Sequence, residues 1–277
     1  EEFTQEMVDS LVQKSNIAFR EKYRNLDVLL IDDIQFLTKK QGGSTMNKKS
    51  PAGLYIHVPF CMQKCRYCDF YSFPKGEEYF GIYKNRVIEA IEFYGKKYAR
   101  PYNSLYFGGG TPTLLPTECF SEIMNALYGC FEVDGGAEIS VECNPATIAR
   151  EGLASLRALG INRLSIGLQS ANENELKALG RLHSFEDFCR CYSDAREAGF
   201  DNISVDLMYG IPEQTLESFE NTLRRVVELS PEHISAYGLK IEEGTPFGKM
   251  KEKLVLPDED TEYDMYMGCT EHLARAG

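Results

Sequence analysis

The chain has 277 residues, 43% of them hydrophobic, which is enough for one large α/β domain with a small appendage. Its formal net charge of −12 counts against a broad nucleic-acid-binding surface, and no stretch is apolar for long enough to span a membrane. Because the nine cysteines are odd in number and the first residues, Glu1-Glu2-Phe3-Thr4, lack the basic and apolar parts of a signal peptide, we expect a reduced, cytoplasmic setting.

Residues 1–45 form the first segment of the chain. The apolar spacing predicts a helix over 6–23, and an apolar strand follows that ends near Asp32 and Asp33. A buried strand followed by carboxylates is typical of the Walker B element, in which an aspartate helps to hold Mg²⁺. The chain contains no G-x-x-x-x-G-K-[ST] phosphate loop, so we expect no ATPase activity and interpret both aspartates as polar residues at a strand end.

A polar, glycine-containing junction over 39–45 separates this segment from residues 46–277. Residues 1–42 resemble part of the bacterial replication initiator DnaA family, so we interpret 1–45 as a DnaA-like fragment with a linker. A chimeric or misassembled reading frame and an engineered fusion are the alternative origins. The strand over 28–31 has no obvious partner in the second domain, and we expect it to pack loosely.

Three cysteines, Cys61, Cys65 and Cys68, lie within eight residues. Three thiolates can hold three irons of a cubane cluster and leave the fourth iron open. The alternatives are buried cysteines that pack as small hydrophobic residues, and a zinc site completed by His57. The polar residues between the cysteines favour a loop, and His57 lies inside the preceding apolar strand pattern. The sequence therefore favours an iron–sulfur cluster.

Strand–helix units follow one another from Leu54 onward. Glycines such as Gly160 and Gly199 mark helix ends. Such alternation predicts a parallel sheet with right-handed crossovers, and six units are fewer than the eight of a closed barrel. We therefore expect an α/β fold, a partial (β/α)6 TIM-like barrel. The expected strands are 54–58, 103–107, 137–142, 162–167, 202–207 and 233–238, and the expected helices are 78–99, 117–131, 147–159, 172–180, 185–198 and 214–229, with another beginning near Asp258.

Polar and glycine residues stand where these strands end. Parallel barrels place their ligand sites at the carboxyl ends of the strands, and glycines let the backbone approach a ligand closely. One polar residue there often only caps a helix, but several on successive strands indicate a site. The series is Gly108-Gly109-Gly110-Thr111-Pro112, Glu142, Gln169 and Asp206, and Arg181 follows the short helix expected over 172–180.

The cysteine spacing, Cx3Cx2C, and the glycine turn resemble those of radical S-adenosylmethionine (SAM) enzymes. From about Met46 to the last residue, the strand-end series resembles the family of oxygen-independent coproporphyrinogen III oxidases, and within it the HemW-type haem chaperones. The resemblance implies a partial (β/α)6 barrel of the radical SAM type. It also implies a [4Fe–4S] cluster and SAM as cofactors, with haem as a further ligand.

The resemblance assigns roles residue by residue, and it assigns none as catalytic. Cys61, Cys65 and Cys68 match the cluster ligands. Residues that match SAM-contacting positions are Tyr55, Tyr67, Gly109, Gly110, Thr111, Glu142, Gln169, Arg181 and Asp206, and ordinary packing is the alternative for both tyrosines. His183 is interpreted as a helix-flanking histidine rather than a haem ligand. The implied partners are haem or a porphyrinogen and an electron donor of the flavodoxin or ferredoxin type.

Two departures from the family bear on function. The oxidases carry another cysteine two residues after the third ligand, where this chain has Phe70. The family also continues into a C-terminal domain, which we expect this chain to lack. Phe70 favours a haem chaperone over a decarboxylating oxidase. A replication-initiator function, resting on residues 1–42 alone, and a non-functional chimeric fragment are the remaining alternatives.

Overall fold

The structure is a computed structural model that describes residues 30–32, 52–74 and 76–276. The helix expected over 6–23, the junction over 39–45 and Asp33 lie outside the described residues. The strands are β1 (Leu30–Asp32), β2 (Ala52–Val58), β3 (Phe60–Cys61), β4 (Phe73–Pro74), β5 (Pro101–Gly109), β6 (Glu132–Cys143), β7 (Arg163–Gln169), β8 (Ile203–Tyr209) and β9 (His233–Gly238). The α-helices are α3 (Phe80–Lys97), α4 (Thr117–Cys130), α5 (Arg150–Ala158), α6 (Glu173–Leu179), α7 (Phe185–Glu197), α8 (Leu216–Val227), α9 (Pro246–Lys249) and α10 (Glu259–Ala276). Three short 3₁₀ helices are η2 (Glu77–Tyr79), η3 (Pro112–Leu114) and η4 (Lys251–Lys253).

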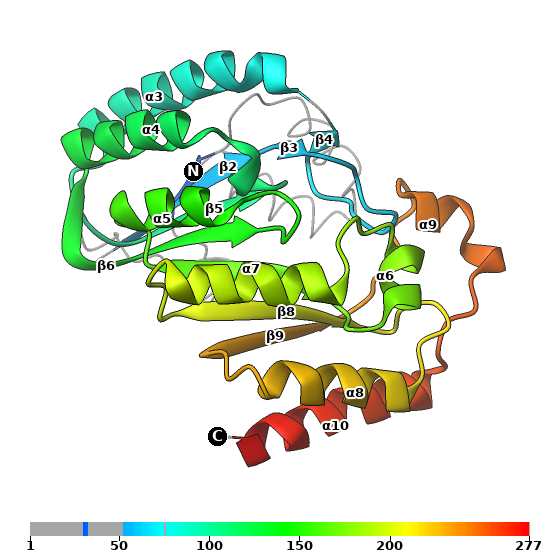
Figure 1. Cartoon of the computed structure of the whole chain (residues 1–277). Coiled ribbons are helices and arrows are strands. Elements are labelled where there is room, and N and C mark those ends of the chain that lie inside the picture. The colour runs from blue at the N-terminus through cyan, green and yellow to red at the C-terminus, as the bar shows by residue number, and fades with distance from the viewer. Residues whose placement is uncertain (1–29, 33–51, 75, 277) are drawn as a thin grey trace, which may run out of the picture.

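Six parallel strands form the centre of the protein. They lie in the order β2-β5-β6-β7-β8-β9, which is also their order along the chain. The helices between them follow one another around the outside of the curved sheet (Figure 1). The predicted partial (β/α)6 barrel is therefore confirmed, with each expected strand within a few residues of its observed position.

One face of the central strands carries half-buried and polar residues such as Tyr55, Glu142 and Asp206, whereas the face that the helices cover is fully buried. Ile56, Val141, Leu164 and Val205, from four of the strands, have no exposed surface. Burying such a side chain contributes about 1.5–3 kcal/mol. The last strand, β9, is more exposed than its neighbours, so the barrel is open on that side.

The helix ends use the signals that the sequence displays. Ser184 caps α7 in a capping box with Asp187, which satisfies N–H groups that have no partner within the helix. Gly160 and Gly199, just after α5 and α7, have φ of 97° and 90°, values that glycine adopts readily. None of the described helices is both long and apolar enough to cross a membrane.

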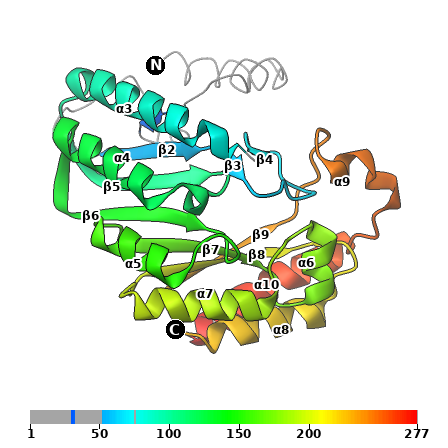
Figure 2. The ribbon, with the colours of Figure 1, turned by 45° about the horizontal axis from the view of Figure 1, so that its top comes forward.

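The carboxyl ends of the strands carry the shorter elements. Strands β3 and β4 pair with each other in a separate small sheet, and they lie with α6 and α9 at the end to which the barrel strands point (Figure 2). The sequence patterns did not predict β3, β4 or α9, because elements of two to four residues carry too little periodicity. These elements build the walls of the candidate site.

Strand β1 corrects one expectation. We expected residues 28–31 to lack a partner in the barrel, but Leu30–Asp32 pairs antiparallel with β2, Leu30 opposite Ile56 and Asp32 opposite Leu54. The physical reason is that β2 is the first barrel strand, whose outer edge offers unpaired N–H and C=O groups to any nearby extended segment. Three residues of the first segment thus extend the sheet to seven strands.

Candidate functional site

The three cysteines lie in the loop between β2 and α3. Cys61 belongs to β3 and is buried, whereas Cys65 and Cys68 are half-buried, and all three are free thiols. Burial raises the pKa of the Cys61 and Cys68 thiols. The loop is anchored by backbone hydrogen bonds that Arg66 makes on both sides, from its N–H to the Leu179 carbonyl (3.0 Å) and from the Phe247 N–H to its own carbonyl (3.0 Å). The cysteines are therefore held by the α6 and α9 regions of the barrel mouth.

The glycine turn after β5 packs directly on this loop. The N–H of Gly110 donates to the Val58 carbonyl (2.8 Å), and the N–H of Thr111 donates to the Phe60 carbonyl (2.6 Å). A Cβ on Gly110 would stand 2.5 Å from the Phe60 carbonyl oxygen, so only glycine fits there. The Thr111 hydroxyl donates to the Cys61 sulfur at 3.8 Å. The glycines thus let this turn pack closely on the cysteine loop.

The imidazole ring of His57 packs against Gly109 of the glycine turn. Its Nε2–H donates to the Tyr71 carbonyl (2.8 Å), so its Nδ1 accepts from the Tyr55 hydroxyl (3.0 Å). Burial lowers the pKa of this histidine, which favours the neutral ring that these two bonds require. With both ring nitrogens engaged, His57 is not free to complete a zinc site. A Cβ on Gly109, where φ is 115°, would collide with the imidazole ring.

Glu142, near the end of β6, binds the glycine turn through its carboxylate. Its carboxylate accepts from the Gly109 N–H (2.9 Å) and from the Tyr106 hydroxyl (3.0 Å). Burial raises the pKa of Glu142, and the nearby charge of Asp206 adds to this effect, while the two hydrogen bonds act against it. The carboxylate is thus a partly desolvated anion at the barrel mouth.

Asp206 and Gln169 extend the site across the next strands. The Ser165 hydroxyl donates to the Asp206 carboxylate at 3.0 Å, and burial raises the pKa of Asp206 as well. Gln169 is 4% exposed, and its Oε1 accepts from the Tyr237 hydroxyl (2.8 Å). Two carboxylates in a partly desolvated mouth favour a ligand that carries positive charge.

Arg181 connects the strand ends to the cysteines. One terminal nitrogen, Nη1, donates to the Cys65 sulfur at 3.5 Å, and the other, Nη2, donates to the Gly167 carbonyl at 2.6 Å. Its Nε is buried and has no hydrogen-bond partner. Tyr67 interacts electrostatically with Arg181 and Cys65 and packs beside the small apolar cluster of Leu179, Met208, Ile211 and Phe247. The guanidinium charge beside a thiol favours an anionic ligand group nearby.

All twelve residues that the sequence singled out gather at this mouth. Hydrogen bonds or electrostatic interactions link most of them to one another, whereas Gln169 is joined to the others through Tyr237 and Gly110 is bonded to Val58. Sequence reasoning missed the supports His57, Tyr106 and Tyr237. The sequence signalled two of them, and only by position. His57 lies two residues after Tyr55 and shares its face of β2, and Tyr106 lies two residues before Gly108 and shares its face of β5.

Three thiols, one arginine and two carboxylates suit a cluster with an open iron and a ligand that carries both charges. Within residues 52–74 and 76–276, no three His, Cys, Asp or Glu side chains gather as they would around one metal ion. A cubane cluster places its irons at separate corners, so its thiolates need not meet at one point.

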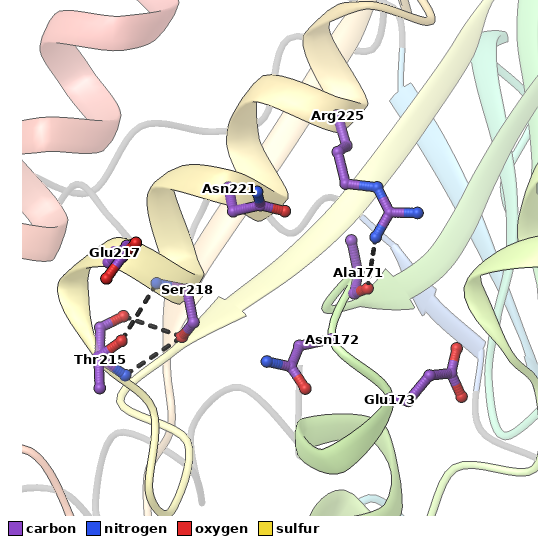
Figure 3. A pocket seen from close by; sticks show the side chains of 8 residues that line it. All are labelled: Ala171, Asn172, Glu173, Thr215, Glu217, Ser218, Asn221 and Arg225. Carbon is purple, nitrogen blue, oxygen red and sulfur yellow. Dashed lines mark hydrogen bonds between the residues drawn. The ribbon is translucent and has the colours of Figure 1, made fainter.

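A separate cavity of about 410 Å³ lies between the starts of α6 and α8 (Figure 3). It is polar, and its lining includes Asn172, Glu173, Thr215 and Arg225. None of the candidate site residues lines it. Arg225 stacks on the Phe185 ring (3.7 Å) and donates to the Ala171 carbonyl (2.9 Å), so it has a structural role.

Comparisons with known proteins agree with this geometry. Residues 55–226 match the radical SAM superfamily, and residues 1–47 match the bacterial DnaA ATPase domain. The haem chaperone HemW of Escherichia coli (strain K12) is 37% identical over 235 residues, which are 84% of this chain and 61% of that protein. HemW of Bacillus subtilis (strain 168) is 36% identical over 219 residues, 76% of this chain and 57% of that protein. The chain thus spans about three fifths of the length of these relatives.

A solved structure extends the similarity to the fold. Coproporphyrinogen III oxidase (HemN) from Escherichia coli, described as a radical SAM enzyme, superimposes with a TM-score of 0.76 and 31% sequence identity. The match covers 83% of this chain and 54% of that one. The radical SAM methyltransferase TsrM from Kitasatospora setae shares the fold at a TM-score of 0.56 and 18% identity.

Proposed function

Because the chain belongs to the radical SAM superfamily, whose cofactors are a [4Fe–4S] cluster and SAM, we propose that it is a HemW-like protein that binds both and handles haem. Cys61, Cys65 and Cys68 hold three irons of the cluster in this proposal. The observation that carries it is the packing of the cysteine loop against the glycine turn, with Thr111 on the sulfur of Cys61 and Arg181 on that of Cys65.

A cluster held by Cys61, Cys65 and Cys68 would supply one electron for the reductive cleavage of SAM. The chain's own residues bind and orient the ligand. Glu142 and Asp206 attract its positively charged amino and sulfonium groups, and the positive charge of Arg181 attracts an anionic group. Gly109 and Gly110 let the turn pack against His57 and the cysteine loop because neither has a side chain, and Gln169, Tyr55 and Tyr67 form further walls of the site.

Phe70 supports the haem chaperone over the oxidase. It is 68% exposed on the cysteine loop, at the position where the oxidases carry an additional cysteine. The alternative function is the radical oxidative decarboxylation of the propionate groups of coproporphyrinogen III. Without the thiol of the oxidases, the chain is expected to bind haem and leave the porphyrinogen unchanged. In either function an electron donor of the flavodoxin or ferredoxin type reduces the cluster.

Haem retention is the result expected from the proposed function. Reduced, cluster-loaded protein is incubated with haem or with coproporphyrinogen III in the presence of SAM. Haem should remain with the protein through gel filtration, seen as its Soret absorbance, and chromatography should detect no decarboxylated porphyrinogen. Turnover of coproporphyrinogen III without haem retention would instead assign the chain to the oxidases.

The first segment is expected to be dispensable for the cofactors. The first candidate site residue along the chain is Tyr55, and the parallel pairing of β2 with β5 does not involve residues 1–45. A chain lacking residues 1–45 should keep its iron content and its SAM affinity, and neither form should hydrolyse ATP because the phosphate loop is absent. Loss of iron in the shortened chain would show that the segment is an integral part of the domain, through the pairing of β1 with β2.

A further inference from the structure

Strand β7 ends in an irregular backbone that carries Gln169. The register between β7 and β8 shifts between Gly167 and Gln169, so Leu168 has no residue opposite it in β8. The pairing with β6 stops at Ile166. Gln169 has a φ of 75°, a left-handed value that residues other than glycine rarely adopt. Such a conformation persists only where the surrounding contacts enforce it.

Two side chains supply donors to the carbonyls of this segment. Arg181 donates from Nη2 to the Gly167 carbonyl (2.6 Å), and His183 donates from Nε2 to the Leu168 carbonyl (3.2 Å). Both come from the short segment between α6 and α7. These two side-chain donors replace the backbone N–H groups that a neighbouring strand would donate to the carbonyls of a regular strand. His183 therefore acts on the residue that the shifted register leaves unpaired.

His183 is a neutral donor in a buried setting. It is 3% exposed, and burial together with the charge of Arg181 lowers its pKa to about 4. Since a carbonyl only accepts, the proton of the neutral ring is on Nε2. The other nitrogen, Nδ1, is buried without a hydrogen-bond partner, which carries a cost that an apolar side chain would avoid. The bond to Leu168 is thus the one contact that requires a histidine here.

The residues that follow Gln169 are held as well. The Ser170 hydroxyl donates to buried Glu175 (2.6 Å), and Arg225 donates to the Ala171 carbonyl (2.9 Å; Figure 3). The Gln169 side chain is fixed at its far end by Tyr237. His183 supplies the remaining restraint, at the residue directly before Gln169.

We propose that His183 is a positioning residue that holds the irregular end of β7 and thereby sets Gln169 and Arg181 for SAM. The inference rests on the proposed function, in which those two residues face the ligand. It differs from the helix-flanking role that the sequence suggested for His183.

The test measures SAM affinity by calorimetry on the anaerobically reconstituted full chain. His183→Phe keeps a ring and removes both nitrogens, and we expect it to weaken SAM binding about tenfold, as loss of a ligand-orienting partner commonly does, with iron content unchanged. His183→Gln keeps an N–H donor and should restore most of the affinity. In a Gln169→Ala background, His183→Phe should weaken binding by a smaller factor than in the wild-type background, because only its effect through Arg181 remains.

Controls separate the outcomes. His272→Leu, on α10, should leave the affinity unchanged, and His183→Leu is the second variant if His183→Phe fails to fold. Equal affinity of wild type and His183→Phe, equal loss in the Phe and Gln variants, or full additivity with Gln169→Ala would each overturn the inference while the proposed function stands. Wild-type protein that binds no SAM would refute the proposed function and the inference together.

Discussion

Replacing Cys65 by alanine should abolish the iron–sulfur cluster. Wild-type protein reconstituted without oxygen is expected to bind about four irons per chain and to turn brown, because three thiolates retain a cubane cluster. Cys65 is the middle ligand of the loop and receives the Arg181 guanidinium on its sulfur, so no neighbouring thiol replaces it. Iron analysis and the absorbance of the cluster in visible light measure the loss.

The other six cysteines provide the matched controls. Cys119→Ala and Cys143→Ala, on α4 and at the end of β6, should leave iron content and absorbance unchanged. Cys143 is the sharper control because it directly follows Glu142 and its sulfur lies 3.9 Å from that of Cys191, away from the loop. Loss of the cluster in Cys143→Ala with retention in Cys65→Ala would refute the ligand assignment.

Changes at the glycine turn should weaken SAM binding without removing iron. In Gly109→Val the new side chain collides with His57 at a φ of 115°, so the turn must move away from the cluster loop. Glu142→Ala removes the acceptor of the Gly109 N–H and, in the proposed function, a carboxylate that attracts the ligand. Each is expected to cost about 1–3 kcal/mol, or about 5- to 150-fold in affinity, measured by calorimetry.

Two variants control for trivial effects of these changes. Gly135→Val lies in β6, where an added Cβ meets nothing within 4 Å, and it should bind SAM as the wild type does. Glu142→Gln keeps the shape and one acceptor oxygen but not the charge, so an intermediate affinity separates the electrostatic contribution from the support of the turn. Unchanged affinity in both Gly109→Val and Glu142→Ala would exclude this placement of SAM.

The sequence predicted the barrel because its signals are local and repeated. Each buried strand is an apolar run, each crossover helix has its own period, and the polar strand-end residues meet at one edge by topology alone. The partnering of those residues was not predictable. That Glu142 holds the Gly109 N–H, and that Arg181 reaches Cys65 across 116 positions of the chain, depends on side-chain packing in three dimensions.

The irregular features escaped sequence reasoning for the same reason. Gln169 occupies a left-handed conformation without the glycine that usually signals it, because contacts from Arg181 and His183 enforce it. Strand β1 pairs with β2 because an open sheet edge accepts an extended segment whatever its origin. Both are decided by tertiary context and not by local propensity.

Electron paramagnetic resonance of the reduced protein, with and without SAM, tests the central claim most directly. The claim is that Cys61, Cys65 and Cys68 leave one iron open and that the glycine turn, Glu142 and Arg181 present SAM to it. We expect a [4Fe–4S] signal whose g-values change when SAM is added, in wild type but not in Glu142→Ala at the same SAM concentration. A cluster signal that SAM leaves unchanged in the wild type would contradict the account.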